Sequence, residues 1–304
     1  WTGDCPLHED DGRCGLQREC GEAVLTSVCR YYPRSPKVRY ADECSCANAC
    51  EGVLELIMSR REPMRFIETP LTFIMPEAEY THAAAQTASY IGLRRAIIHI
   101  VQDRRHSLPQ RIWRAGMLCR AISPFSVCGH EDAMADIVRS FESDFDDVEM
   151  VISDGSAISV MLDFTDEFDE KSVNLAKYGE GAAEYFRNGG SAASARKILY
   201  SKLPDFDVYM EQIMVNHIFY TTFPYSDVHE SAAADFLSLC AAYALLRFLA
   251  LGHAEDISGT ESLVDIYASA FRLIECSNFD RRAAAWLHSY SHDGDETVTA
   301  LLNL

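Results

Sequence analysis

The sequence lacks several patterns that would place it in a common class of protein. Its longest apolar stretch, 237–251, is shorter than the roughly 18 residues that a transmembrane helix needs and is interrupted by Arg247, so we expect a buried helix there. The G-x-G-x-x-G pattern of dinucleotide-type pockets is absent. The Cys-x2-Cys pair that is typical of zinc ribbons and bacterial ferredoxins is absent too. These absences argue against a dinucleotide-type cofactor pocket, a zinc ribbon and a bacterial-type ferredoxin.

Basic residues are also scarce. The chain has 27 Lys and Arg against 46 Asp and Glu, which gives a formal net charge of −19. Because nucleic acid binding needs clustered Lys and Arg, we expect no nucleic acid partner. No membrane-spanning segment or signal peptide is recognisable, so we expect no membrane partner either. The acidity suits simple solubility or a cationic, lysine-rich substrate, and composition leaves both interpretations open.

Cysteine, in contrast, is concentrated at one end of the chain. Seven of the eleven cysteines lie between Cys5 and Cys50, and the last 254 residues hold four. A chain of 304 residues can fold without disulfides, which argues against a secreted disulfide-rich module. Thiolates suit zinc or an iron–sulfur cluster, and the wide, irregular spacing favours neither; plain buried cysteines are the remaining alternative. The seven are Cys5, Cys14, Cys20, Cys29, Cys44, Cys46 and Cys50.

Apolar spacing predicts a mostly α-helical protein, in which an N-terminal cysteine-rich metal-binding module (1–60) is followed by a multi-helix domain (61–304). Within the module, helices are expected at 16–29 and from about 47, so that Cys50 lies in the first turn of the second helix. A helix N-terminus stabilises a thiolate and therefore favours metal ligation at Cys50.

The second domain is expected to consist of successive helices. A short extended segment at 71–74, a hairpin around Asp154 and Gly155, and a weak tail at 299–304 are the exceptions. The expected helices are 83–104, 109–122, 130–145, 173–186, 192–203, 206–222, 231–251, 261–276 and 281–290.

Two groups of motifs resemble a known family. The first group comprises Cys5-Pro6-Leu7, Gly12-Arg13-Cys14, Cys29-Arg30-Tyr31-Tyr32-Pro33-Arg34, and Cys50-Glu51 at the start of an apolar helix. The second is Val215-Asn216-His217-Ile218-Phe219 followed by Phe223-Pro224-Tyr225. In this order they resemble the flagellin lysine-N-methylase family, weakly over most of the chain and specifically at these motifs.

The resemblance implies a cytoplasmic enzyme that methylates surface lysines of flagellin, with S-adenosylmethionine as methyl donor. It also implies a [4Fe-4S] cluster, with zinc as the alternative, held by the cysteine module. The ligands carried over by position are Cys5, Cys14, Cys29 and Cys50. The residues that we expect to bind substrate or donor are Arg30, Tyr32, Arg34, Asn216 and Tyr225. The resemblance identifies no catalytic base.

Physical reasoning on single residues leaves alternatives open. His217 lies in an apolar helix, where a packed core histidine is the more common outcome. Asn216 needs a polar partner if it is buried, either a ligand or a neighbouring backbone group. For the whole chain, the alternatives to a methylase are an iron–sulfur redox protein and a zinc-stabilised helical scaffold that binds protein partners without catalysis.

The cysteine cluster predicts that Cys29→Ser lowers both metal content and solubility, because a lost thiolate leaves the metal short of a ligand. Metal analysis of the purified protein and its soluble yield measure this. From its distance along the sequence, Cys276 is expected to lie outside the module, so Cys276→Ser is expected to leave both unchanged. Equal losses in the two variants would contradict the assignment.

Overall fold

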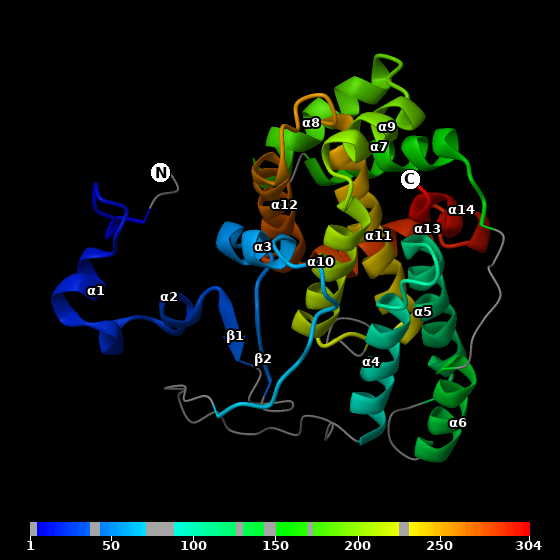
Figure 1. Ribbon diagram of the computed structural model, residues 1–304, viewed down its shortest axis with the longest axis horizontal. Helices are drawn as coiled ribbons and strands as arrows, with labels where there is room; N and C mark the ends of the chain where they lie inside the picture. The colour runs from blue at the N-terminus through cyan, green and yellow to red at the C-terminus, as the bar shows by residue number, and fades with distance from the viewer. Residues whose placement is uncertain are drawn as a thin grey trace.

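Helices dominate the architecture, as the apolar spacing predicts. The structure is a computed structural model that describes residues 5–36, 43–70, 88–125, 130–142, 150–169, 173–224 and 231–304. These residues form fourteen α-helices and one two-stranded antiparallel sheet (Figure 1). The expected extended segment at 71–74 lies outside the described residues.

The helices are α1 (Gly15–Cys20), α2 (Ser27–Tyr31), α3 (Glu51–Met58), α4 (Ala88–Val101), α5 (Leu108–Ile122), α6 (Glu131–Glu142), α7 (Asp154–Asp169), α8 (Val173–Arg187), α9 (Ala192–Lys202), α10 (Phe206–Tyr220), α11 (Ala232–Gly252), α12 (Thr260–Glu275), α13 (Phe279–Ser289) and α14 (Asp295–Leu302). The strands are β1 (Arg34–Pro36) and β2 (Cys44–Cys46), and a short 3-10 helix spans Glu22–Val24.

Helix α11 is the centre of the helical body, where it packs against α5, α8, α9, α13 and α14 (Figure 1). With 21 residues and a mean hydropathy of 1.7 it is long and apolar enough to cross a membrane, but 89% of its apolar window is buried in this structure. It is therefore the buried helix that the sequence predicts. Arg247 is also buried, with Nη1 3.3 Å from Asp207 Oδ1 and 3.3 Å from the Tyr243 hydroxyl oxygen.

Two sequence-based expectations in the second domain are wrong. The hairpin around Asp154 and Gly155 is instead the start of α7, because Ala157, Met161, Phe164 and Phe168 recur at helical spacing and are all buried. The residues expected to form a tail, 299–304, instead include the second half of α14. The apolar residues of this helix are buried in the core.

The N-terminal helix expected at 16–29 is also wrong, because it is divided into α1, the 3-10 turn and α2. Gly21, the residue that ends α1, has a φ of 80°, a conformation that residues other than glycine rarely adopt. Helices α1 and α2 project from the helical body, and the short β1–β2 ladder, which pairs Arg34 with Cys46, connects them to it (Figure 1).

Helix α3 packs on the helical body between α10 and α12. Its residues Leu54, Ile57 and Met58 are buried in the same core as the helices of the second domain. The predicted domain boundary after residue 60 stays a prediction, but the core itself extends across that boundary.

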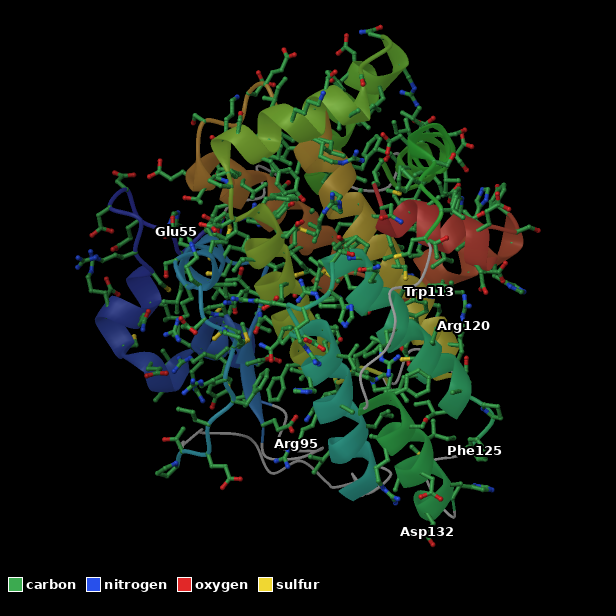
Figure 2. The ribbon with its side chains drawn as sticks, turned by 45° about the vertical axis from the view of Figure 1, so that its right-hand side comes forward. Glu55, Arg95, Trp113, Arg120, Phe125 and Asp132 are labelled. Atoms are coloured by element: carbon green, nitrogen blue, oxygen red, sulfur yellow. The ribbon has the colours of Figure 1, made fainter. Side chains whose placement is uncertain are left out.

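Helices α5 and α11 approach closely at Gly116, where a Cβ atom would lie 2.0 Å from Cζ of Phe236. That ring is fully buried, and Trp113 and Arg120, labelled on α5 in Figure 2, pack near it with a centroid distance of 6.4 Å and a guanidinium distance of 5.9 Å. The ring therefore has little room to move.

We expect Gly116→Ala to lower the free energy of unfolding by about 1–3 kcal/mol, since the added methyl group overpacks this contact. Gly92→Ala in α4 is the matched control, because nothing lies within 4 Å of a Cβ atom there. It should stabilise the protein by about 0.5–1 kcal/mol through helix propensity. Urea unfolding of the two variants measures both effects. Equal changes in unfolding free energy would contradict the close contact between Gly116 and Phe236.

Candidate functional site

Helix α10 is mostly apolar, but four of its polar residues, Glu211, Gln212, Asn216 and His217, are buried. A buried polar group destabilises the fold unless it has a hydrogen-bond partner. The first two residues hold the connector that follows α3, and the last two hold the loop that precedes α3.

Asn216 binds the loop between β2 and α3. Its Nδ2 donates to the Cys46 carbonyl oxygen at 2.8 Å and to Asn48 Oδ1 at 2.7 Å, while Asn48 Nδ2 donates to the Ile213 carbonyl oxygen at 3.2 Å. Because both carbonyls can only accept, the orientation of the two amides is fixed. Among the described residues none donates to Asn216 Oδ1, so this oxygen is available to a ligand.

Helix α12 holds the same loop from its other side. The Ala49 N–H donates to Glu275 Oε2 at 3.1 Å, and the other oxygen of that carboxylate lies 3.4 Å from His217 Nδ1. His217 is buried, with its ring 5.6 Å from that of Phe271. It is thus a packed core histidine, as the sequence favoured, and supports the loop through Glu275.

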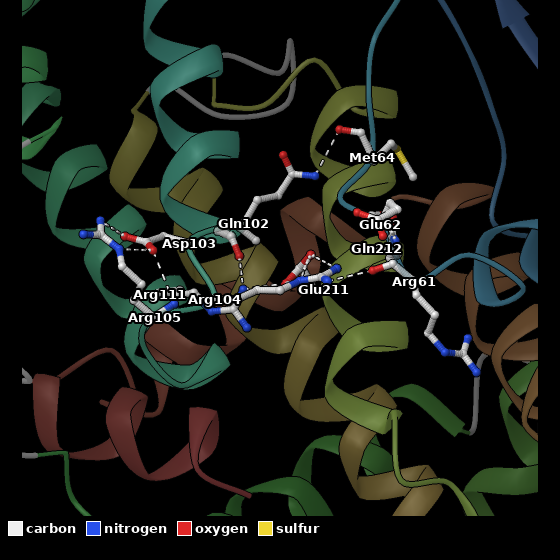
Figure 3. A network of polar contacts seen from close by, with 11 residues as sticks. Arg61, Glu62, Met64, Gln102, Asp103, Arg104, Arg105, Arg111, Glu211 and Gln212 are labelled. Atoms are coloured by element: carbon white, nitrogen blue, oxygen red, sulfur yellow. Dashed lines mark hydrogen bonds and ion pairs between the residues drawn. The ribbon is translucent and has the colours of Figure 1, made fainter.

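A buried ion cluster lies on the N-terminal side of Asn216, around Glu211 in the middle of α10 (Figure 3). Glu211, 1% exposed, accepts from Arg104 Nε at 3.1 and 3.0 Å and from Arg104 Nη2 at 2.8 Å. Arg111 Nη1 donates to the same carboxylate at 2.6 Å. A buried carboxylate with two guanidinium partners is well compensated, whereas the loss of a partner would leave a charge without compensation.

The ion cluster and its neighbours fix the connector after α3, residues 59–66. Arg104 Nη1 donates to the Arg61 carbonyl oxygen at 2.7 Å, Gln212 Nε2 to that of Glu62 at 2.5 Å, and Gln102 Nε2 to that of Met64 at 3.1 Å (Figure 3). The connector has no regular secondary structure of its own. Its backbone carbonyls therefore accept hydrogen bonds from side chains of α10 and of the α4–α5 loop, in place of the backbone N–H donors that a helix or sheet would supply.

A pocket of about 620 Å³ lies between α3 and the connector. Its size is within the range of about 300–1,000 Å³ that is usual for small-molecule sites. Cys46 and Asn216 line it together with side chains of α3 and of the connector. The remaining lining residues are Val53, Leu56, Ile57, Arg60, Arg61, Glu62, Pro63, Met64 and Arg65. The pocket thus combines apolar walls with three arginines, one carboxylate and the open oxygen of a fixed amide.

Tyr32, another predicted binding residue, is not among the residues that line the pocket and lies within electrostatic reach of the N-terminal end of α3. Burial, followed by the charges of Cys50 and Glu51, raises its pKa to about 12. It therefore remains a neutral phenol at physiological pH and can donate a hydrogen bond. Tyr225 lies outside the described residues.

The two predicted arginines lie in the N-terminal part. Arg30 Nη2 donates to the carbonyl oxygens of Ala23 and Leu25 at 2.7 and 3.0 Å, so it braces the turn before α2. Arg34 Nη2 donates to the Arg30 carbonyl oxygen at 3.1 Å. Its charge also opposes the effect of burial, which raises the pKa of Cys44 and of Cys46.

The predicted metal ligands divide between two places. Cys5, Cys14 and Cys29 belong to the projecting N-terminal part, whereas Cys50 is the N-cap residue of α3 on the helical body (Figure 1). Across the described ranges, no three His, Cys, Asp or Glu side chains are spaced to hold a metal ion. The described residues therefore do not by themselves form a site that fits a cluster, and the four-ligand set stays a prediction.

The residues that hold the two borders of the pocket were not predicted from the sequence. Asn48 and Glu275, which hold the loop, and Glu211 and Arg111, which hold the connector, are all largely or fully buried. One signal was present, since Glu211 and Gln212 interrupt an apolar helix in the same way as Asn216 and His217. The partners of Asn48, Glu211 and Glu275 lie 58–226 positions away in the sequence, which no local pattern reveals.

Arg104→Ala should loosen the connector, because it removes the bonds to both Glu211 and the Arg61 carbonyl. We expect a loss of about 1–3 kcal/mol in unfolding free energy and faster tryptic cleavage after Arg60 or Arg65. Arg105→Ala is the control, since its ion pair with Asp103 is exposed on the arginine side and is expected to contribute less than about 1 kcal/mol. Equal cleavage rates in the two variants would contradict the role of Arg104 in holding the connector.

Residues 94–284 match the family described as the FliB lysine N-methylase C-terminal domain. The curated proteins and the solved structures that were compared contain no significant match to this chain.

The matched segment runs from α4 to α13 and includes α10, with both of its polar pairs, and the last turn of α12. It covers more than half of the chain and agrees with the resemblance at 215–225. The chain belongs to the FliB lysine N-methylase family.

Proposed function

We propose that the chain transfers methyl groups from S-adenosylmethionine to lysine side chains of flagellin, and that the pocket between α3 and the connector holds the donor. The family match supports lysine methyl transfer. The donor assignment rests on one observation, a pocket of about 620 Å³ with apolar walls and separate polar groups that are held by buried networks.

The lining chemistry suits the parts of the donor. The side chains of Val53, Leu56 and Met64 offer an apolar surface for the adenine ring, and Arg60 or Arg65 can pair with the donor's carboxylate. Asn216 Oδ1 can accept a hydrogen bond from an amino or hydroxyl group. Because Asn216 is held by two acceptors, this interaction needs no reorganisation when the donor binds.

The reaction is a displacement at carbon. The lone pair of a neutral lysine nitrogen forms the new N–CH₃ bond, the S–CH₃ bond breaks with its electron pair going to sulfur, and the nitrogen then releases one proton to solvent water. S-adenosylhomocysteine leaves as the neutral thioether. The step needs no oxidant or reductant, and its rate depends on holding the two reactants close together and in line.

The charge of the protein suits this substrate. With a net charge of −19, the chain attracts lysine-rich surfaces before contact, and the attraction weakens as salt screens it. A cysteine-bound [4Fe-4S] cluster, or zinc in its place, stays part of the proposal on the cysteine content of the N-terminal part. The displacement itself makes no demand on it.

The first experiment incubates the anaerobically purified protein with flagellin and methyl-labelled S-adenosylmethionine. We expect label on flagellin lysines, identified by peptide mass spectrometry, and S-adenosylhomocysteine in equal amount. Flagellin with acetylated lysines is the control. If neither label nor S-adenosylhomocysteine forms, the methyl transfer proposal is wrong.

A second experiment tests the donor pocket. Leu56→Trp places a large ring in the pocket from an exposed position on α3, where the side chain is 59% exposed and the fold does not depend on it. We expect binding of S-adenosylhomocysteine, measured by calorimetry, to weaken at least about tenfold, which corresponds to about 1.4 kcal/mol.

The matched control is Glu55→Trp, on a different face of the same helix. Glu55, labelled in Figure 2, is exposed and lines a separate cavity with Met58 and Ser59. It should leave binding unchanged. Equal affinities in both variants would place the donor elsewhere without affecting the proposed reaction.

A further inference from the structure

The pocket between α3 and the connector has two different ends, because the chain contacts different positions of α10 before and after α3. The loop before α3 is bound by Asn216, through the Cys46 carbonyl and Asn48. After α3, Arg61 Nη2 donates to the Tyr209 hydroxyl oxygen at 2.9 Å. Asn216 lies seven positions after Tyr209 on α10, a rise of about 10.5 Å.

An apolar stripe of α3 joins the two ends. Val53, Leu56 and Ile57 recur at the spacing of one helix face, and all three line the pocket. Val53 belongs to the first turn of α3, next to the loop, and Arg60 follows the last turn. The pocket therefore extends from an Asn216 end, with Asn216 and Cys46, to an Arg60 end, with Arg60 and Glu62.

Of the three arginines that line the pocket, Arg61 is already engaged. Its Nε lies 2.8 Å from Asp205 Oδ2, and its Nη1 donates to the Met58 carbonyl oxygen at 3.0 Å. With the bond from Nη2 to Tyr209, all three nitrogens have partners. Arg60 is exposed, and in the described part of the chain no group forms a hydrogen bond or ion pair with its guanidinium. Arg60 is therefore available to an anionic ligand group.

Arg65 belongs to the Asn216 end of the pocket. The residue after it, Phe66, stacks on Phe219 with ring centroids 4.2 Å apart. Phe219 follows Asn216 by three positions on α10. At Arg65 the connector has therefore already passed from the end of α3 to the Asn216 end.

The Arg60 end combines two opposite charges. Glu62 follows Arg60 by two positions and lines the pocket with it, and the Glu62 carbonyl oxygen is held by Gln212 at 2.5 Å. An amino-acid group carries a carboxylate and an ammonium close together, so it needs a cation and an anion that are also close together. Arg60 and Glu62 supply that pair, whereas the lining residue beside Arg65 is the apolar Met64.

We propose that the methyl donor lies along this pocket with its amino-acid group at Arg60 and Glu62 and its base at Asn216. The inference rests on the proposed function for the identity of the ligand. It also decides which of the two available arginines pairs with the donor's carboxylate. The two ends are separated by an apolar wall that an adenosine with an amino-acid chain on its sulfur can follow.

Asn216 then determines which base is bound. Its Nδ2 donates to the Cys46 carbonyl and to Asn48, so its Oδ1 can only accept a hydrogen bond from the ligand. Adenine offers its exocyclic amino group as the donor. A base with a carbonyl oxygen at that position would place two acceptors against each other, and the pocket should reject it.

This orientation also places the reacting group. The sulfonium lies between the base and the amino-acid group, and hence beside the apolar stripe of α3. Leu56, in the middle of that stripe, is 59% exposed. A lysine side chain of the substrate can therefore approach the methyl group from solvent at this point.

The test compares Arg60→Gln with Arg65→Gln in the full-length chain. Both arginines are exposed, so neither change disturbs the core. Calorimetry measures binding of S-adenosylhomocysteine and of methylthioadenosine, which lacks the amino-acid group. We expect Arg60→Gln to weaken binding of S-adenosylhomocysteine at least about tenfold, through loss of a charge-assisted hydrogen bond, and to leave methylthioadenosine unaffected. Arg65→Gln should change neither affinity.

Two results would overturn the inference. A loss of S-adenosylhomocysteine binding with Arg65→Gln in place of Arg60→Gln would reverse the orientation of the donor. Equal losses of both ligands in Arg60→Gln would show that this arginine does not act on the amino-acid group.

The base is tested by changing the ligand, because Asn216 also holds the loop. S-inosylhomocysteine has a carbonyl oxygen in place of the exocyclic amino group. We expect the wild-type chain to bind it at least about tenfold more weakly than S-adenosylhomocysteine, since Asn216 Oδ1 would be left without a donor. Equal affinities for the two ligands would overturn the placement of the base at Asn216.

Failure of the inference can be told apart from failure of the proposed function. If the wild-type chain does not bind S-adenosylhomocysteine, the donor pocket is wrong and the inference is overturned with it. If Leu56→Trp weakens binding but Arg60→Gln does not, the pocket holds the donor and the inference alone is overturned. Transfer of label to flagellin is measured independently of both.

Discussion

The buried carboxylate of Glu211 is the interaction on which the site depends. It pairs with Arg104 from the α4–α5 loop and Arg111 from α5, and Arg104 in turn holds the connector through the Arg61 carbonyl. Burying a charge is unfavourable unless partners surround it, so the three side chains are stable only together. This requirement fixes α4, α5, α10 and the connector relative to one another, and the pocket wall is the result.

The loop between β2 and α3, on the other side of the pocket, is held by buried polar groups that likewise need partners, but here most of them are uncharged. Asn216 donates to Asn48, each of the two amides donates to a backbone carbonyl, and the Ala49 N–H donates to the carboxylate of Glu275. These bonds replace regular secondary structure between β2 and α3. The flanking alanines, Ala47 and Ala49, are almost fully buried, and their small size allows the loop to lie directly on the helices.

Much of the fold could be predicted from the sequence, because apolar spacing decides where a helix forms. Helices α5, α9 and α11 begin and end within two residues of their expected bounds. The α7 region was misread because Val148, Met150, Ile152, Ile158 and Val160 suggest alternation, whereas the buried set that decides the structure includes Phe164 and Phe168 further along. The division of the N-terminal helix at Gly21 shows how one backbone conformation overrides apolar spacing.

The site was predicted less well. Asn216 was identified, but Asn48, Glu211 and Glu275 were not, because their partners are distant in sequence and a single sequence does not show contacts.

The two polar pairs of α10 have a geometric consequence. Glu211 and Gln212 hold the connector, Asn216 and His217 support the loop, and the second pair lies five positions after the first, a rise of about 7.5 Å. That distance is set by covalent geometry and cannot change without unwinding the helix. Helix α10 therefore sets the spacing between the loop and the connector that border the pocket, while α3 and the connector supply most of the side chains that line it. A substitution among those side chains would change the lining of the pocket and leave this spacing unchanged.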